Sequence, residues 1–251
     1  MTTFALVHGG WHGRWCWDLL TPLLERGGHR VVTMDLPCDD PRADLEDYAD
    51  VVCAALAECG GDITLVGHSL GGNTIPIVAV RRPVSHLVYL CAVLPLPGSS
   101  LMDQVADDPG MLNPGYLPAL SEPDDQNRQV WVDPALTRRH LYADCDDAVA
   151  AAAMARLRPQ ALHPMLQPYP LRELPAVDST YVVCTDDLMV PSEWSRRVAP
   201  GRVGADLIEL PGSHSPFLSR PRALAEVLLG VAGVGETTVG DAISPQTAQQ
   251  P

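Results

Sequence analysis

One stretch in the first third of the chain constrains the fold more than any other: Ile63-Thr-Leu-Val-Gly-His-Ser-Leu-Gly-Gly72. Its β-type start runs directly into a Gly-x-Ser-x-Gly pattern, and an apolar helical pattern follows as far as Val80. A strand, a sharp turn and a helix in this order form the structural context in which such a serine acts as a nucleophile. The stretch therefore predicts that Ser69 is a nucleophile rather than part of an ordinary glycine-rich turn.

The backbone at such a turn is strained, and the glycines at positions 67 and 71 remove the Cβ atoms that would collide with their neighbours. The turn would hold the Ser69 hydroxyl clear of the sheet. A serine hydroxyl is a poor nucleophile at its own pKa, so it needs a base, usually histidine, and an acid that orients the base. Other parts of the chain must supply both.

Among the eight histidines, His214 is the best placed to serve as the base. It lies in a loop that follows the last expected strand and precedes the last expected helix: Leu210-Pro-Gly-Ser-His-Ser-Pro-Phe217. Ligands of open parallel sheets bind at the carboxyl ends of the strands, so this loop should meet the serine turn at the same edge. We therefore expect His214 to take the serine proton.

Three further histidines have simpler interpretations. His8 and His12 share one loop, but no acidic or cysteine ligand accompanies them, so they favour loop structure over a metal site. His68 neighbours the nucleophile, and we expect it to support the site rather than to act as the base. The sequence therefore predicts no metal.

Two candidates for the acid follow a short strand in Tyr181-Val-Val-Cys-Thr-Asp-Asp-Leu-Met-Val-Pro191. Asp187 is preferred because it stands four residues before Pro191, as the acid does in the α/β-hydrolase pattern, and Asp186 is the alternative. The chain order serine, aspartate, histidine is that of α/β-hydrolases and differs from the chymotrypsin-like and subtilisin-like orders.

A tetrahedral intermediate also needs two hydrogen-bond donors for its oxyanion. The backbone N–H of Leu70 is the first candidate, because it lies at a helix N-terminus where the dipole favours negative charge. The second should come from the first glycine loop, His8-Gly-Gly-Trp-His-Gly13, and Gly10 is our choice. The alternative for this loop is a tight turn with no catalytic part.

The remaining segments alternate between strand and helix patterns. Expected strands are 4–7, a buried strand over 30–36, 87–93, 181–184 and 207–210, and expected helices begin near Trp15, Leu45 and Ala223. Such alternation implies a parallel sheet covered by helices on both faces. The expected fold class is therefore α/β.

The alternation stops between Leu94 and Pro175, where proline, acidic and large apolar residues dominate. We expect a core domain in two parts, 1–93 and 176–234, with a small, largely helical cap inserted over 94–175. Within the cap, residues 144–158 should be helical and residues 95–123 irregular. Residues 235–251 have little to bury, and we expect a disordered tail.

Composition excludes several functions. With 31 acidic and 17 basic residues the net charge is −14, which argues against nucleic acid or an anionic membrane as a partner. No lysine occurs, so a Schiff base, pyridoxal phosphate attachment and a Walker A loop are excluded. The seven cysteines form no Cys-x-x-Cys pair and favour free thiols in a reducing compartment. With no signal-like N-terminus, the expected location is the cytoplasm.

The motifs together resemble the α/β-hydrolase superfamily, and within it the group of plant methyl esterases, hydroxynitrile lyases and pyrethroid-type esterases. The matching segments span most of the chain: 7–17, Gly67 to Gly72, Tyr142-Ala-Asp-Cys145, Val183 to Asp187 and Gly212 to Pro216. The resemblance implies an α/β-hydrolase fold, a Ser-His-Asp triad, no cofactor and an acyl pocket beneath the cap. The lyases of the group have a lysine after the catalytic histidine, where this chain has Ser215, so cyanohydrin cleavage is disfavoured.

The favoured function is a serine esterase acting on a neutral, apolar, small-to-medium ester, with a homodimer left open. Apolar residues of the first loop and the cap are candidates to line the pocket: Trp11, Leu96, Met111, Tyr116 and Trp131. The alternatives are a non-hydrolytic enzyme of the same fold (lyase, cyclase or C–C bond cleavage) and a receptor-like binding protein. A dinucleotide-binding fold is disfavoured because His8 stands where its fingerprint requires the first glycine.

Overall fold

The computed structural model describes residues 1–234, and the expected tail, 235–251, lies outside them. The described chain is built on one parallel sheet with strand order β2-β1-β3-β4-β7-β8. Its strands are β1 (Thr3–Val7), β2 (Arg30–Thr33), β3 (Ile63–His68), β4 (His86–Leu90), β7 (Ser179–Cys184) and β8 (Asp206–Leu210). The expected parallel sheet is confirmed.

The strand order places two glycine-rich loops side by side. From β1 the chain crosses to β2 at one edge, and it then returns over β1 to β3, so the direction of winding reverses between β1 and β3. These two strands are neighbours in register, with Val7 opposite Gly67. Ligands of such sheets bind at the carboxyl ends of the strands where the order reverses. The loops after β1 and β3 therefore meet at that position.

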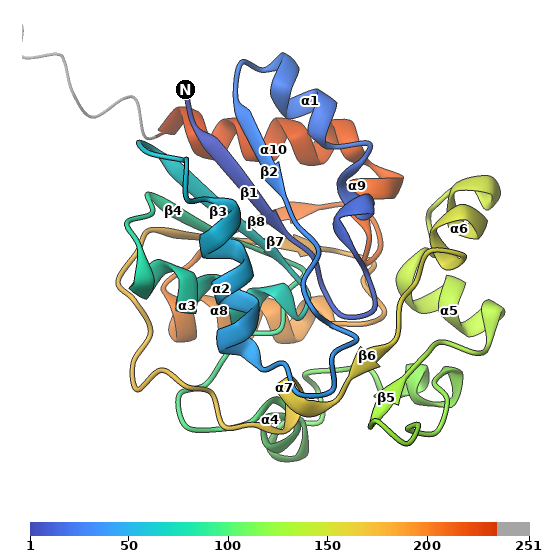
Figure 1. The fold of residues 1–251 in the computed structure, drawn as a ribbon. Helices are drawn as coiled ribbons and strands as arrows, with labels where there is room; N and C mark the ends of the chain where they lie inside the picture. Colours follow the sequence, from blue (N-terminus) through green and yellow to red (C-terminus); the bar gives the residue numbers. More distant parts are fainter. Residues whose placement is uncertain (235–251) are drawn as a thin grey trace, which may run out of the picture.

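Helices cover both faces of the sheet (Figure 1). On one face, α1 (Thr21–Arg26) packs against α10 (Pro221–Val234), which follows the short α9 (Pro216–Ser219). On the other, α2 (Leu45–Ala55) packs against α3 (Gly71–Arg81), and α8 (Ser192–Val203) lies against β7. None of the helices within residues 1–234 has the length and apolar character needed to cross a membrane.

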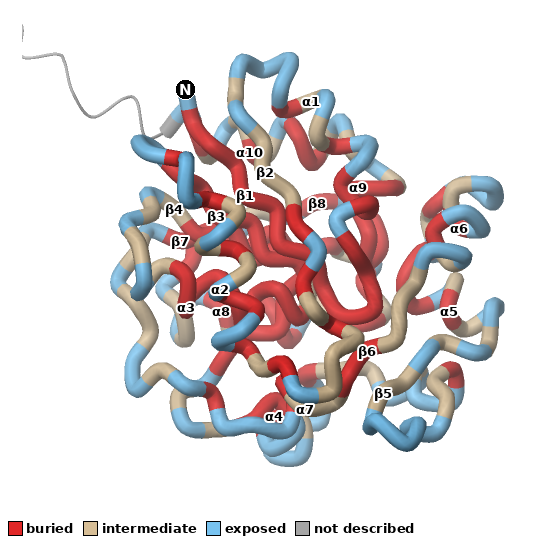
Figure 2. Tube along the Cα trace, viewed as in Figure 1, coloured by how far each residue is buried: buried red, intermediate tan, exposed pale blue. Residues whose placement is uncertain are grey.

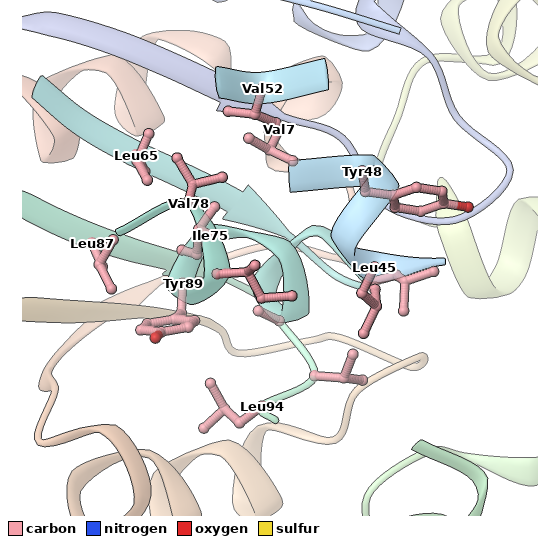
Figure 3. Close-up of a cluster of buried hydrophobic side chains, with 14 of the residues drawn as sticks. Val7, Leu45, Tyr48, Val52, Leu65, Ile75, Val78, Leu87, Tyr89 and Leu94 are labelled. Atoms are coloured by element: carbon pink, nitrogen blue, oxygen red, sulfur yellow. The ribbon is translucent and has the colours of Figure 1, made fainter. Parts of the chain in front are cut away.

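The core consists of two layers, because successive side chains of each strand point to opposite faces. Along β1, Phe4 and Leu6 join the cluster beneath α1 and α10, whereas Ala5 and Val7 join the cluster beneath α2 and α3. Figure 3 shows the second cluster, and Figure 2 shows that burial is concentrated along the central strands. This two-sided burial holds the carboxyl ends of β1 and β3 rigidly in place.

The segment between β4 and β7 carries its own short elements and lies beside the carboxyl edge of the sheet (Figure 1). They are α4 (Leu101–Asp107), a 3₁₀ helix (Pro114–Ala119), β5 (Arg128–Gln129), α5 (Pro134–Leu141), α6 (Asp147–Met154), β6 (Gln160–Ala161) and α7 (His163–Leu166). The expectation of an irregular 95–123 is wrong for α4, where Ser100 and Asp103 form a capping box that stabilises the helix start. The helix expected over 144–158 is shorter, because only α6, Asp147–Met154, is helical within that range.

Two expectations for the core also differ from the structure. The segment predicted as a buried strand, 30–36, forms only the four-residue β2, whose side chains are exposed or half-buried. The physical reason is that β2 is an edge strand paired on one side only, with β1. The helix expected from Trp15 is interrupted: a 3₁₀ turn ends at Trp17, and α1 starts afresh at Thr21, where Pro22 suits a first helical turn.

Candidate active site

The turn after β3 has the strained geometry that a nucleophile elbow requires. Ser69 adopts a φ of +51°, in the left-handed region that residues with side chains rarely occupy. A Cβ atom on Gly67 would lie 2.7 Å from the carbonyl oxygen of Gly71, and one on Gly71 would lie 2.7 Å from that of Val7. Because neither residue carries a Cβ atom, α3 can approach β1 and β3 closely enough to form this turn.

A buried aspartate–histidine pair lies at the same edge of the sheet. His214 Nδ1 lies 2.8 Å from Asp187 Oδ2, and the side chains are 2% and 1% exposed respectively. The other carboxylate oxygen, Oδ1, accepts the backbone N–H groups of Met189 at 2.7 Å and Val190 at 3.0 Å. A carboxylate held in this way orients the imidazole and leaves its Nε2 atom as the basic nitrogen.

Asp186, the alternative acid, points elsewhere. It is exposed, and its carboxylate accepts the backbone N–H of Gly212 at 3.2 Å and the hydroxyl of Thr185. It therefore supports the backbone of the histidine loop, whereas Asp187 contacts the imidazole.

The loop between β8 and α9 that carries His214, residues 211–215 (the base loop), is attached directly to the serine turn. His68 Nε2 donates to the carbonyl oxygen of His214 at 2.9 Å, and the two rings lie 4.7 Å apart. Ser69 is only partly buried, and its hydroxyl makes no hydrogen bond within residues 1–234. Catalytic hydrogen bonds often tighten only when substrate binds. The structure thus brings together the three residues expected to form a triad: Ser69, Asp187 and His214.

Both expected oxyanion donors lie beside the serine. A Cβ atom on Gly9 would lie 2.7 Å from Ser69 Cβ, so the first glycine loop packs directly against the nucleophile. Within residues 1–234, the backbone N–H groups of Gly10 and Leu70 donate to no protein acceptor. Buried N–H groups are nearly always paired, so two unpaired donors beside a serine suit a developing oxyanion.

The histidines of the first loop set the direction of its peptide groups. His8 Nδ1 lies 2.8 Å from the carbonyl oxygen of Gly9, and its Nε2 accepts the backbone N–H of Leu36 at 2.9 Å. Carbonyl and N–H point in opposite directions across a trans peptide. By holding the Gly9 carbonyl, His8 therefore fixes the direction of the Gly10 N–H.

Burial keeps three histidines near the serine neutral. It lowers the pKa of His8 from 6.5 to about 4 and that of His12 to about 3, and it lowers the pKa of His68 well below 6.5. Each ring can therefore act as a directed donor–acceptor without adding positive charge beside the base.

These buried histidines should make the protein less stable as the pH falls from 7 to 5. Their pKa values are lower in the folded than in the unfolded chain, so the unfolded chain binds more protons below about pH 6.5. The contribution of these histidines to the free energy of unfolding is complete above about pH 6.5 and is lost on acidification, for His8 down to about pH 4. Urea unfolding at pH 7, 6 and 5 measures it, because unperturbed carboxyl groups titrate lower, near about pH 4. A constant free energy of unfolding would contradict neutral burial.

Within residues 1–234, one group of potential metal ligands converges at the site. Cys91, Asp187 and His214 have ligand atoms within 4.8 Å of one another. The Asp187–His214 hydrogen bond already accounts for two of them, as a triad requires. All seven cysteines are free thiols, as predicted, and all but Cys53 are buried.

The expected pocket residues separate into different places. Trp131 packs edge-on against Trp11, with ring centroids 5.5 Å apart, and lies 6.0 Å from Tyr116. Met111 is buried in the same cluster as Leu70, which follows the nucleophile. Leu96 is not brought to these aromatic rings. It is 40% exposed and lines a separate shallow hollow with Val198 and Arg202 of α8.

One further residue of the site carries no recognisable signal in the sequence. Gln160, fully buried on β6, accepts the backbone N–H of Trp11 at 3.2 Å and donates to the Tyr48 hydroxyl at 3.2 Å. The neighbouring Arg158 donates its backbone N–H to the Trp11 carbonyl at 2.7 Å. No motif surrounds Gln160. Only the packing of the inserted segment onto the first glycine loop identifies it.

Comparisons with known proteins agree with this geometry. Residues 4–227 match the sequence profile of the alpha/beta hydrolase family. The chain is 32% identical to a pyrethroid hydrolase of Sphingobium wenxiniae, covering 92% of this chain and 88% of that protein. It is 28% identical to salicylic acid-binding protein 2 of Nicotiana tabacum, covering 91% and 96%. The crystal structure of a pyrethroid hydrolase from Sphingobium faniae superposes with a TM-score of 0.79 at 29% identity, covering 92% and 97%.

Proposed function

This chain belongs to the alpha/beta hydrolase family, and on that premise we propose that it is a serine esterase that uses Ser69, His214 and Asp187. The observation that carries the proposal is the buried 2.8 Å hydrogen bond between His214 and Asp187, in a loop attached to the strained serine turn. The names of the relatives, several of them esterases or hydrolases, support the same reaction class.

In the proposed mechanism, the Ser69 oxygen attacks the ester carbonyl carbon while His214 Nε2 takes its proton. Asp187 stabilises the resulting imidazolium. The tetrahedral oxyanion accepts hydrogen bonds from the N–H groups of Gly10 and Leu70. His214 then protonates the departing alcohol, and an acyl-enzyme remains. Water attacks the acyl carbon with His214 as base, which releases the acid and restores Ser69.

The proposed substrates are neutral, largely apolar esters of small to medium size. The aromatic cluster of Trp11, Tyr116 and Trp131 supports an apolar and flat group beside the first glycine loop, residues 8–13, which carries the Gly10 donor and is called the oxyanion loop below. The net charge of −14 disfavours strongly anionic esters. Two relatives are named as pyrethroid hydrolases, which also supports an apolar ester.

The proposed setting is the cytoplasm of a bacterial cell, with a small-molecule ester as the partner and with neither nucleic acid nor membrane required. The seven free cysteines support a reducing compartment. Every group in the proposed mechanism comes from the chain itself, so the reaction needs no cofactor.

Hydrolysis of short-chain p-nitrophenyl esters tests the proposal, together with labelling by a serine-directed fluorophosphonate. We expect p-nitrophenol release that the reagent abolishes, and a single adduct on Ser69 by peptide mass spectrometry. Labelling of Ser69 without turnover on any ester would instead favour a lyase, cyclase or C–C bond-cleaving enzyme. The absence of both labelling and turnover would favour a binding protein.

A further inference from the structure

A short segment of the insertion contacts two loops of the active site from one side. This segment, Tyr142–Asp144, follows α5 and precedes α6. Tyr142 is fully buried and Asp144 is partly buried, whereas Ala143 between them is exposed. The two polar side chains therefore point inward from either side of one exposed residue.

The Tyr142 end reaches the oxyanion loop through a histidine. The Tyr142 hydroxyl lies 2.9 Å from His12 Nε2, and His12 Nδ1 lies 2.9 Å from the carbonyl oxygen of Gly10. Since burial keeps His12 neutral and raises the pKa of Tyr142 well above 10, each ring holds its proton in one arrangement. The tyrosine O–H donates to Nε2, and Nδ1–H donates to Gly10.

This chain of hydrogen bonds fixes one peptide plane of the oxyanion loop. The Gly10 carbonyl and the Trp11 N–H belong to the same peptide group and point in opposite directions. The first accepts from His12, and the second donates to Gln160 at 3.2 Å. Gly10 has no side chain to limit its rotation, so these bonds hold the peptide group that follows it, while His8 holds the preceding peptide group, which carries the Gly10 N–H.

The Asp144 end reaches the loop that carries the base. One carboxylate oxygen, Oδ1, accepts a hydrogen bond from the hydroxyl of Ser213, the residue before His214. The other, Oδ2, accepts from Arg220 Nε at 3.2 Å. A Cβ atom on Gly212, whose φ is +135°, would lie 2.8 Å from Asp144 Oδ2. The carboxylate thus lies directly over the backbone that leads to His214.

We propose that Tyr142 and Asp144 are positioning residues that clamp the two catalytic loops: Tyr142 orients the oxyanion loop through His12, and Asp144 orients the base loop through Ser213. The expected effect of the clamp on kcat rests on the proposed esterase function, whereas its expected effect on the order of the two loops does not. It assigns a role to the Tyr142-Ala-Asp-Cys145 motif, and it makes the insertion part of the catalytic machinery rather than only a cover.

The Tyr142 end is tested with Tyr142→Phe, which keeps the ring and removes the donor. Direct loss of an oxyanion donor costs roughly 10²- to 10³-fold in kcat, so we expect a smaller loss of about 10-fold, with KM changed less than about 2-fold. Tyr89→Phe, which removes another buried tyrosine hydroxyl on β4, is the matched control and should keep wild-type kcat.

The Asp144 end is tested with Asp144→Ala, Ser213→Ala and the double variant, with Asp144→Asn as the conservative replacement. We expect each alanine variant to lower kcat about 10-fold and the double variant to lower it little further, because both remove the hydrogen bond between Ser213 and Asp144, whereas the exposed contact with Arg220 contributes little. Asp144→Asn keeps an acceptor for Ser213 and should recover most of the activity. Additive losses, or no recovery by asparagine, would overturn this half of the proposal.

Amide hydrogen exchange separates the clamp from the proposed function, because it needs no substrate. In Tyr142→Phe we expect faster exchange in residues 8–12 and unchanged exchange in 211–215, and in Asp144→Ala the reverse. If the wild-type protein has no esterase activity but the two variants show these exchange changes, the proposed function is overturned and the clamp is supported. Unchanged exchange at both loops would overturn the clamp, whatever the activity.

Discussion

Replacing Ser69 with alanine is expected to lower kcat for ester hydrolysis by about 10⁶-fold, to the level left by the other groups of the site. The physical reason is that no acyl-enzyme can form without the hydroxyl, while binding and the oxyanion donors remain. Alanine should also fit the turn, since the Ser69 hydroxyl makes no hydrogen bond within residues 1–234 whose loss would unfold it.

The measurement is p-nitrophenyl ester hydrolysis under saturating conditions, with unfolding in urea to show that the variant folds. Ser85→Ala is the matched control, because Ser85 is exposed at the opposite end of the sheet, just before β4. It should retain wild-type kcat. Turnover of Ser69→Ala within about 10-fold of wild type would refute the nucleophile assignment, and the next residue to test would be Cys91, whose thiol lies near His214.

Replacing Asp187 with asparagine is expected to lower kcat by about 10⁴-fold with little change in the fold. The asparagine carbonyl can still accept the N–H groups of Met189 and Val190, as Asp187 Oδ1 does. Its amide N–H₂ then faces His214 Nδ1, which must accept a hydrogen bond instead of donating one. The imidazole carries its proton on Nε2 in that tautomer and cannot take the proton of Ser69.

Asp186→Asn provides the matched control for this substitution. The two aspartates are adjacent, but the Asp186 carboxylate contacts Gly212 and Thr185 rather than the imidazole. We expect it to change kcat by less than about 10-fold, since an exposed carboxylate contributes little. The two variants are compared by kcat on the same ester and by unfolding midpoint. If Asp186→Asn lowered kcat more than Asp187→Asn does, Asp186 rather than Asp187 would be the acid that orients His214.

The fold follows from the sequence where local pattern and tertiary environment agree. The central strands are buried on both faces, so they are continuous apolar runs that can be recognised by themselves. Helix α8 has no such signal, because Ser192–Val203 contains charged residues and Pro200 and has a weak apolar stripe. It forms because Trp194 and Ala199 pack onto the sheet, which no local pattern reveals.

The candidate site likewise has residues that the sequence could predict and residues that only packing brings into place. Ser69, Asp187 and His214 each follow a strand at its carboxyl end, so spacing and residue type are enough to place them at one edge of the sheet. Gln160 belongs to the insertion and reaches the oxyanion loop only after that segment has packed. Tyr142 belongs to a recognisable motif, but its contact with His12 spans 130 positions of the chain. Leu96, expected near the substrate, lies at a different hollow.

By itself, the sequence determined the parallel α/β sheet, the strained serine turn and the chain order of the three expected catalytic residues. These depend on short-range chemistry: glycines where Cβ atoms would clash, apolar runs for buried strands, and loops at strand ends. Only the tertiary structure decided which aspartate faces His214, which peptide groups point at the oxyanion, and which residues of the insertion hold them. Those outcomes depend on hydrogen bonds between segments far apart in the chain, whose directions are set only when the segments pack together.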